Sequence, residues 1–288
     1  MPSTQNILFL IFLATIFLVL FSLYGFWTAI HPPKFITNLT PKDLGWEYEE
    51  VSLTTKDGIS LSSWFVPSVN KSDQVIILLH GYPADKANLL YWVEFLHPDF
   101  NLFFVDFRYF GNSSGSLTTI GFHEQKDLQV ALDYLEDKGF SKTGVMGFSL
   151  GGAVAISTAS FDERIKSVVS DSAFAKIDLM GHAFYRNLWI LKYPLTQLTL
   201  FWAQIFLRIN VSDSPEKAAQ NLQIPVLLIH SQKDATIPFE NALLLQRALE
   251  QNPKAQTYFL EEGTHGSLPP HLEKEYQKRV AEFFKQNL

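Results

Sequence analysis

The segment Ile7–Ile30 contains 24 residues and no charged side chain. As a helix that rises 1.5 Å per residue it would be roughly 36 Å long, which is enough to cross a hydrocarbon core of about 30 Å. Tyr24 and Trp27 lie where interfacial aromatic residues are common, and Pro32-Pro33 stops the helix. The sequence therefore predicts an N-terminal transmembrane helix.

A cleaved signal peptide is the alternative for this segment. Such a peptide usually has a positively charged start and an apolar stretch of about 7–15 residues. Met1–Asn6 has no Lys or Arg, the apolar run is longer, and no small-x-small cleavage site is evident near its end. A retained single-pass anchor over residues 1–33 is favoured. Its orientation stays open, because only Lys34 and Lys42 follow closely and they favour a cytoplasmic side only slightly.

The composition of the whole chain excludes several kinds of chemistry. Apolar residues make up 47% of the 288 residues, which allows a sizeable core. The formal net charge of −6 argues against a protein that coats nucleic acid, because that function requires a basic surface. Cysteine is absent, so disulfides, thiolate catalysis, zinc–thiolate sites and iron–sulfur clusters are excluded.

The rest of the chain alternates between short apolar runs and longer amphipathic stretches. Two strands joined at Lys56-Asp57-Gly58, and then a series of strands buried on both faces, are expected. These strands are Trp46–Thr54, Ile59–Val66, Val75–Leu79, Leu102–Val105, Gly144–Met146, Ser167–Val169, Val226–Ile229 and Thr257–Leu260. The expected helices are Asp85–Phe95, Phe122–Lys138, Leu150–Ser160, Phe239–Gln251 and His271–Asn287.

This alternation predicts an α/β domain over residues 34–288, with a mostly parallel sheet flanked by helices. The segment at about 174–222 interrupts the rhythm and is expected to be a helical insertion that forms a cap.

The strongest chemical signal is the pentapeptide Gly147-Phe148-Ser149-Leu150-Gly151, which fits the pattern G-x-S-x-G between a strand and a helix. A sharp strand-to-helix turn leaves no room for side chains two positions before and after the serine, so glycine is required there. The turn exposes the hydroxyl of Ser149 beside a helix N-terminus, whose amides can stabilise an oxyanion. Gly111–Gly115 matches the same pattern, but no helix follows it, and a structural loop is expected.

A serine nucleophile needs a base, and the base needs an acid that orients it. His265 follows the last predicted strand, and Asp234 follows the strand before it, so both are expected at the edge of the sheet where active-site loops gather. Asp171, after the strand Ser167–Val169, is the alternative acid. The order Ser149, Asp234, His265 is the one described for α/β-hydrolases.

From about Trp46 to its C-terminus the chain resembles serine hydrolases of the α/β-hydrolase fold, in a membrane-anchored, esterase- or lipase-like branch. The resemblance rests on the segments that contain Ser149, Asp234 and His265, on His80-Gly81-Tyr82, and on the loop Asp106–Gly111. It implies that the backbone amides of Tyr82 and Leu150 form the oxyanion hole and that Arg108 bridges neighbouring loops. It also implies no cofactor. Relatives with an aspartate nucleophile are excluded, because Ser149 occupies that place.

Metal chemistry has no support in the sequence, because no H-E-x-x-H pattern is present. The insertion is expected to determine substrate choice. Residues 179–212 contain no Asp or Glu and many aromatic side chains, of which Phe184, Trp189 and Trp202 are candidates for substrate contact. The insertion is interpreted as a cap over the active site with buried aromatics. A second hypothesis is that part of it also rests on an anionic bilayer.

These features predict hydrolysis of carboxylic ester or thioester bonds of small-molecule or lipid acyl substrates through an acyl-enzyme. A serine peptidase or amidase with the same triad is the alternative, and a non-catalytic binding protein is a third. The expected partners are the acyl substrate and the membrane, through Ile7–Ile30 and through part of the cap, and no nucleic acid. The oligomeric state is left open.

Overall fold

The computed structural model of the chain describes residues 3–288. Met1 and Pro2, the first residues of the predicted anchor, lie outside the described residues. The described chain divides into two compact units. The sheet unit comprises Pro33–Lys176 and Asp213–Leu288, and the helical unit comprises residues 3–32 and Ile177–Ser212. The insertion therefore shares a compact unit with the N-terminal helix, a grouping that the sequence patterns did not indicate.

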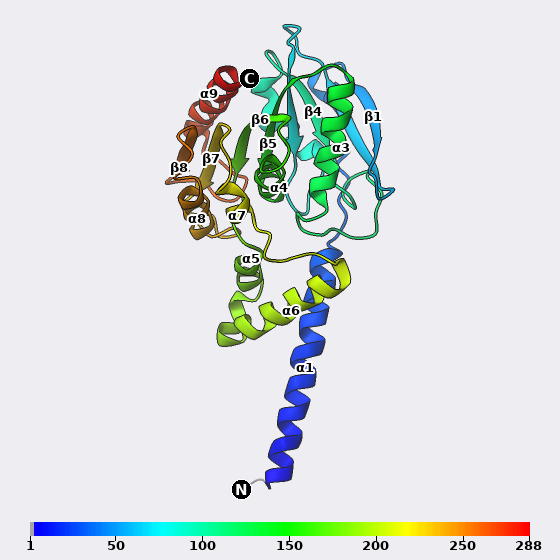
Figure 1. The fold of residues 1–288 in the computed structure, drawn as a ribbon, viewed down its shortest axis with the longest axis vertical. Coiled ribbons are helices and arrows are strands. Elements are labelled where there is room, and N and C mark those ends of the chain that lie inside the picture. Colours follow the sequence, from blue (N-terminus) through cyan, green and yellow to red (C-terminus); the bar gives the residue numbers. More distant parts are fainter. Residues whose placement is uncertain (1–2) are drawn as a thin grey trace. The chain divides into compact units, whose positions relative to one another are not determined.

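The sheet unit contains an eight-stranded sheet with the strand order β1-β2-β4-β3-β5-β6-β7-β8 (Figure 1). The strands are β1 Glu49–Thr54, β2 Ser60–Val66, β3 Gln74–Leu79, β4 Asn101–Val105, β5 Lys142–Phe148, β6 Ile165–Asp171, β7 Val226–Ser231 and β8 Ala255–Leu260. Every predicted strand is confirmed, with ends that differ by a few residues. Only β1 with β2 and β2 with β4 pair in antiparallel fashion, and the other neighbours are parallel.

The central strands are buried on both faces, as their continuous apolar sequences predicted. Ile76 and Leu78 of β3 belong to the core on one face, whereas Val75, Ile77 and Leu79 alternate with them and are equally buried. Helices must therefore cover both sides of the sheet.

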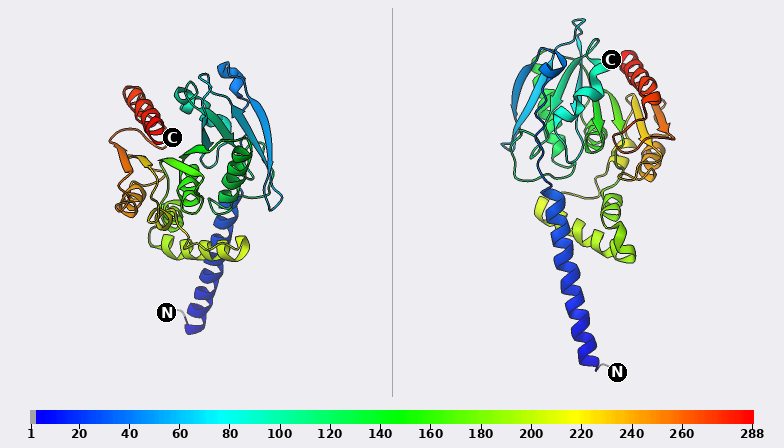
Figure 2. Two further views of the ribbon diagram at one scale, coloured as in Figure 1. Left: turned by 45° about the horizontal axis from the view of Figure 1, so that its top comes forward. Right: turned by 180° about the vertical axis from the view of Figure 1, so that it is seen from behind.

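Helices do cover both faces (Figures 1 and 2). The helices of the sheet unit are α2 Leu90–Val93, α3 Glu124–Asp137, α4 Leu150–Ala159, α7 Pro215–Ala219, α8 Glu240–Ala248 and α9 Pro270–Asn287. Residues of α2 and α9 complete the core on one face, and α4 packs against β5 and β6 beside α3 on the other.

The predicted helix Asp85–Phe95 is not continuous. It consists of α2 between the short 3-10 helices η2 Lys86–Leu89 and η3 Glu94–Leu96. The backbone of Val93 departs from helical geometry at φ −116° and ψ 7°, and this residue ends α2 after one turn. The remaining predicted helices of the sheet unit are confirmed.

The helical unit consists of α1 Thr4–Ile30, α5 Ile177–Phe184, the 3-10 helix η4 Arg186–Leu191 and α6 Lys192–Leu207. Within residues 3–288, α1 is the one helix long and apolar enough to cross a bilayer. Its buried residues all lie in its last third, where α6 packs against it. These residues are Ser22, Gly25, Phe26 and Ile30.

Candidate active site

Ser149 lies between the end of β5 and the start of α4, as the pentapeptide predicted. Its backbone adopts φ 54° and ψ −112°, a conformation that is strained for a residue with a side chain. The amide of Ser149 donates a hydrogen bond to the carbonyl of Asp171 at the end of β6, at 2.8 Å. The turn is thus held by the neighbouring strand.

The two flanking glycines have the steric role that the pattern requires. A Cβ at Gly147 would overlap the backbone of Gly151 and Gly152. A Cβ at Gly151 would overlap the carbonyl of Leu79 at the end of β3. Strand β5 and helix α4 can therefore approach closely enough to form the turn only if both positions lack a side chain.

The loops after β7 and β8 bring Asp234 and His265 to the same edge of the sheet. Asp234 follows β7, and His265 lies in the loop between β8 and α9. The hydroxyl of Ser231 donates to the carbonyl of Gly263 at 2.7 Å, which connects the two loops. The ring of Phe148 packs 4.8 Å from the ring of His265, centroid to centroid, and supports it from the side of β5.

The structure brings the three predicted side chains into one chain of hydrogen bonds. Nδ1 of His265 lies 2.7 Å from Oδ2 of Asp234, and Nε2 lies 3.1 Å from Oγ of Ser149. An ionised carboxylate can only accept, so Nδ1 carries the proton and Nε2 is left to accept from the hydroxyl of Ser149. This is the tautomer that a general base needs.

The surroundings of Asp234 keep it ionised. Burial by itself would raise its pKa, but hydrogen bonds from His265 and from the amides of Ile237 and Thr236 outweigh the burial and lower the pKa below its ordinary value. The two amides both donate to Oδ1 at 2.8 Å. Oδ2 is therefore left for His265.

The two residues expected to supply oxyanion amides border the serine. Leu150 is the first residue of α4, where the backbone N–H groups have no partner within the helix. Tyr82 follows Gly81, and a Cβ at Gly81 would lie 3.2 Å from Cβ of Ser149. The loop after β3 thus runs directly beside the serine, and a side chain at position 81 would crowd Ser149 and Phe148.

Comparison with known proteins agrees with this architecture. The family model described as the alpha/beta hydrolase fold matches residues 74–192. An esterase from Pyrococcus furiosus is 30% identical in sequence, and the superposition covers 90% of this chain and 98% of the esterase, with a TM-score of 0.75.

Two fungal proteins are also similar in sequence. The protein bem46 of Schizosaccharomyces pombe is 28% identical over 216 residues, which are 72% of this chain and 67% of bem46. A membrane protein of Saccharomyces cerevisiae is 29% identical over 147 residues, which are 48% of this chain and 50% of that protein.

The chain belongs to the α/β-hydrolase fold family. The resemblance based on its motifs is thereby confirmed at the level of the fold. Among residues 3–288, the one long apolar helix, near the N-terminus, fits a membrane branch of this family.

The alternative acid of this α/β-hydrolase, Asp171, lies behind the serine and does not bond to His265. Its carboxylate accepts from the hydroxyl of Tyr276 at 2.8 Å and from the hydroxyl of Ser172 at 2.9 Å. Nε1 of Trp92 in turn donates to the Tyr276 hydroxyl at 2.8 Å. Burial raises the pKa of Asp171 to about 6. Sequence analysis missed Tyr276 and Trp92, because no local pattern connects them to Asp171.

The loop that follows β4 has the structural role that was expected. Arg108 forms ion pairs with Asp127 at 2.7 Å and with Asp57 at 2.9 Å, and therefore bridges neighbouring segments as predicted. The second G-x-S-x-G match is also structural. Ser113 is buried, and its hydroxyl donates to the carbonyl of Asp106 at 2.7 Å.

The candidates for substrate contact all belong to the helical unit. Trp202 donates through Nε1 to Oγ of Ser22 in α1 at 3.0 Å. Phe184 is exposed, and Trp189 is 85% exposed. The expectation that the aromatic side chains of the insertion are buried is therefore wrong for many of them, because short helices that pack on one side leave the side chains of their other faces exposed.

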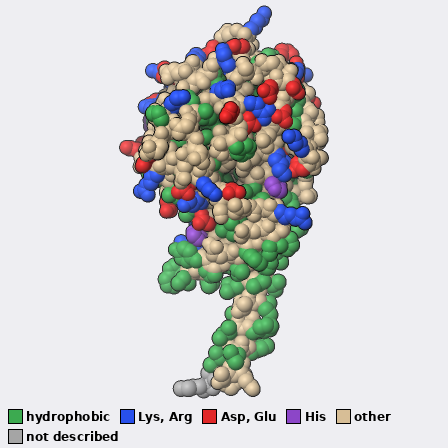
Figure 3. All heavy atoms as spheres, in the orientation of Figure 1, with side chains coloured by type: hydrophobic (Ala, Val, Ile, Leu, Met, Phe, Trp, Pro, Cys, Tyr) green, Lys and Arg blue, Asp and Glu red, His purple; other side chains and the backbone are tan. Residues whose placement is uncertain are grey.

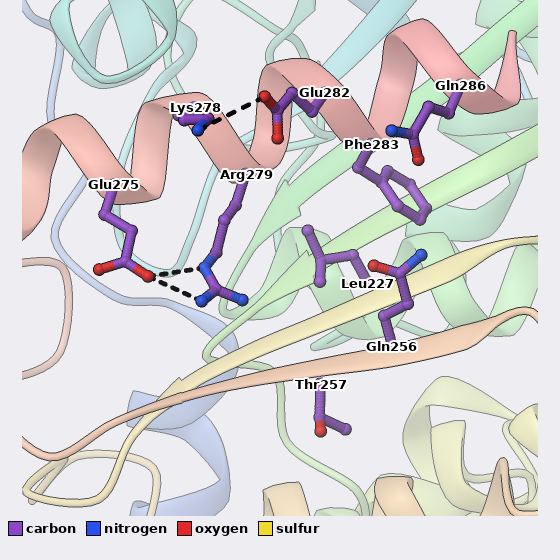
Figure 4. Close-up of a pocket in the computed structure, with 9 residues that line it drawn as sticks. All are labelled: Leu227, Gln256, Thr257, Glu275, Lys278, Arg279, Glu282, Phe283 and Gln286. Atoms are coloured by element: carbon purple, nitrogen blue, oxygen red, sulfur yellow. Dashed lines mark hydrogen bonds and ion pairs between the residues drawn. The ribbon is translucent and has the colours of Figure 1, made fainter.

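A separate hollow lies between α9 and the β7–β8 edge of the sheet (Figure 4). Leu227, Gln256 and Thr257 line it from positions near the start of β7 and β8, whereas Asp234 and His265 follow the ends of these strands. Arg279 pairs with Glu275 at 2.7 Å along its rim. The hollow is thus at the opposite end of the strands from Ser149, and its charges are satisfied by each other.

The described residues 3–288 contain no group of three or more His, Cys, Asp or Glu side chains arranged to hold a metal ion. The polar groups around Ser149 instead bond to one another. The chemistry available at this site is that of a serine, an imidazole and a carboxylate.

Proposed function

We propose that the protein is a membrane-anchored serine hydrolase that cleaves carboxylic ester or thioester bonds of apolar acyl substrates. The observation that carries this proposal is the hydrogen-bonded chain from Ser149 through His265 to Asp234. The similarity to an esterase over nearly the whole length of both chains supports a hydrolase.

In the proposed reaction, His265 accepts the proton of Ser149 through Nε2 as Oγ attacks the substrate carbonyl. Asp234 holds the imidazole in place and stabilises its positive charge. The amides of Leu150 and Tyr82 would donate to the oxyanion of the tetrahedral intermediate, at the N-terminus of α4. His265 then protonates the leaving group, and the same steps with water release the acyl group from Ser149.

The proposed substrate class rests on the composition of the insertion. Residues 179–212 contain no acidic side chain and many aromatic ones, which favours an apolar acyl group over a peptide with a charged N-terminus. The proposed anchor, α1, would keep the enzyme beside a membrane, where lipid acyl groups are concentrated.

The test is hydrolysis of p-nitrophenyl esters from acetyl to palmitoyl by the detergent-solubilised full chain and by Ser149→Ala. Activity that depends on acyl length and is lost in Ser149→Ala supports the proposal. Ser113→Ala is the matched control, because Ser113 belongs to the second G-x-S-x-G match and should leave ester hydrolysis intact in folded protein. Equal inactivity of wild type and Ser149→Ala on every ester would contradict ester hydrolysis and direct the work to peptide and amide substrates.

A further inference from the structure

The helical unit exposes many large apolar side chains outside α1. Phe184, Trp189, Ile190, Leu191, Tyr193, Phe201, Ile205 and Phe206 are all more than 40% exposed. Figure 3 shows hydrophobic side chains gathered over α1, α5 and α6, whereas charged side chains gather on the sheet unit. A surface this apolar on a water-soluble protein is uncommon and indicates that something covers it.

Polar contacts attach α6 firmly to the last third of α1. Trp202 donates through Nε1 to the hydroxyl of Ser22 at 3.0 Å, and the hydroxyl of Thr199 donates to the carbonyl of Ser22 at 3.4 Å. A Cβ at Gly25 would overlap the Tyr185 hydroxyl, so glycine at this position allows the close approach. The ring of Phe206 stacks on that of Phe26, at 5.8 Å between centroids. The exposed face of α6 is therefore continuous with the apolar surface of α1.

The position of this contact along α1 determines how deep α6 would lie in a bilayer that α1 spans. The apolar run Ile7–Ile30 is about 36 Å long as a helix, so it fills a hydrocarbon core of about 30 Å and its last residues reach the headgroups. The buried residues of α1, which lie where α6 packs against it, are Ser22, Gly25, Phe26 and Ile30. When α1 spans a bilayer, α6 therefore lies at the boundary between acyl chains and headgroups. With 16 residues, about 24 Å, it is too short for a comfortable second span.

The charges of the helical unit suit that boundary. Its basic residues are Arg186, Lys192 and Arg208, and Asp178 is its only acidic residue within the described chain. This excess of positive charge contrasts with the net charge of −6 for the whole protein. Lys192 begins α6, and Arg208 follows its last residue, so both ends of an apolar helix carry a cation. Basic side chains at this level are attracted to the phosphates of anionic lipid.

Trp189 lies in the 3-10 helix η4, which directly precedes α6. Its backbone adopts φ 46° and ψ −119°, which is rare for a bulky residue, although the side chain is 85% exposed. Such strain is kept only where the surrounding structure or a function requires it. Tryptophan is enriched at the headgroup level of membranes, where its ring is partly apolar and its N–H can find a partner.

We infer that the apolar face of α5, η4 and α6 is a second membrane contact, in which α6 lies in the plane of the bilayer at the headgroup boundary. The occupant of this face is anionic phospholipid, and Trp189 is a lipid contact. This inference rests on the proposed role of α1 as a membrane anchor. It extends that role, because the insertion and the anchor then form one unit embedded in the membrane.

The absence of cysteine allows a direct test on the full chain. Single substitutions Trp189→Cys, Phe201→Cys and Ile205→Cys are labelled with an environment-sensitive fluorophore and reconstituted in vesicles of phosphatidylcholine and phosphatidylglycerol. Phe12→Cys reports on α1. Val69→Cys and Tyr91→Cys on the sheet unit are matched controls, because their exposed fractions, 65% and 61%, lie within the range of the three test positions.

For labels at positions 189, 201 and 205 of the protein, the inference predicts blue-shifted emission and loss of quenching by iodide. It also predicts that lipids spin-labelled near the headgroup quench these labels strongly. Position 12 should be quenched best by lipids labelled deep in the chain, and positions 69 and 91 by iodide. If iodide quenches the labels at 189, 201 and 205 as strongly as it quenches the controls, the inference is overturned. The anchoring by α1 would not be affected by that result. Shielding from both iodide and lipid would also overturn it and indicate a protein partner or a second copy. A label at position 12 outside the lipid would refute the anchor itself.

Discussion

At the scale of single residues, the site contains two buried carboxylates with different roles. Asp234 accepts from His265 and two backbone amides, and its pKa is lowered. Asp171 accepts from the hydroxyls of Tyr276 and Ser172, and its pKa is raised to about 6. Only the first is bonded to the imidazole, so only the first can determine which of its nitrogens carries the proton.

Replacement of each carboxylate by its amide should separate these roles. Asn at 234 can donate to Nδ1 and thereby favour the tautomer that cannot accept from Ser149. We expect Asp234→Asn to lower kcat for a p-nitrophenyl ester by about 10³–10⁴-fold. Asp171→Asn should stay within about tenfold of wild type, because it retains an oxygen for the Tyr276 hydroxyl. Steady-state kinetics on both folded variants measure this, and the reverse order would assign the acid to Asp171.

The raised pKa of Asp171 also predicts how stability depends on pH. Below pH 4 the carboxyl is protonated in both states and has no effect. Between about pH 4 and 6 the unfolded chain gives up this proton more readily than the folded one, so the free energy of unfolding falls as pH rises, by at most about 3 kcal/mol. Asp171→Asn has no carboxyl at this position and therefore lacks this pH-dependent contribution to the free energy of unfolding. Thermal unfolding at pH 4, 5.5 and 7 should show the stability of Asp171→Asn rising relative to wild type, and a constant difference would contradict the raised pKa.

At the scale of elements, α1 has two different parts, its first two thirds and its last third. The first has large apolar side chains exposed on every face, and the last third has one face against α6. The composition alone predicted the helix, because an uncharged run of this length has few alternatives. The partner of its last third depends on Ser22 and Gly25, two small residues that are unremarkable in an apolar sequence.

Charges in the middle of α1 should remove the protein from the membrane. Arg at the centre of a spanning helix costs about 2.5–3.5 kcal/mol of insertion free energy, so Leu13→Arg together with Ile16→Arg should cost about 5–7 kcal/mol. We expect this double variant in the supernatant after alkaline carbonate extraction, and the matched variant Leu13→Ala, Ile16→Ala in the pellet. If both variants stay in the pellet, α1 does not anchor the chain by spanning.

At the scale of the whole molecule, the chain folds as two units that are each assembled from distant segments. The sheet unit is interrupted by Ile177–Ser212, yet its two flanks meet. The amide of Glu216 donates to the carbonyl of Ala175 at 3.1 Å, and Lys176 pairs with Glu216 at 2.8 Å. The sheet unit therefore has its own core, and the two chain segments that flank the insertion contact each other within it.

The division into two units predicts which segments can be deleted while the sheet unit still folds. A chain that lacks residues 3–32 alone should aggregate or bind vesicles, because it exposes the surface of α6 that contacts α1. A chain that lacks residues 3–32 and also has a short Gly-Ser linker in place of 177–212 should be soluble and monodisperse. It should hydrolyse p-nitrophenyl acetate in a reaction that depends on Ser149. Size-exclusion chromatography and esterase assays compare the two, and equal solubility would contradict the pairing of anchor and insertion.

The fold and the candidate site could be predicted from local sequence, because they depend on local features. A turn signal predicted the first two strands, and continuous apolar runs predicted the others. The spacing of Gly147, Ser149 and Gly151 predicted a turn that leaves no room for side chains at the two glycine positions. The loops of Asp234 and His265 could be placed because parallel strands end at one edge of a sheet. The catalytic roles of these residues, and of Tyr82 and Leu150, stay predictions.

Tertiary structure alone decided the features that join distant segments. Tyr276 reaches Asp171 across 105 residues of sequence, and Trp202 reaches Ser22 across 180. No periodicity encodes such pairs, since each depends on how whole helices are placed in three dimensions. The sequence by itself thus determined the sheet, the sharp turn at Ser149 and the long apolar helix. Tertiary packing places Asp234, rather than Asp171, against the imidazole of His265. It also brings the insertion into one compact unit with α1. Both results depend on contacts between segments that are distant in the sequence.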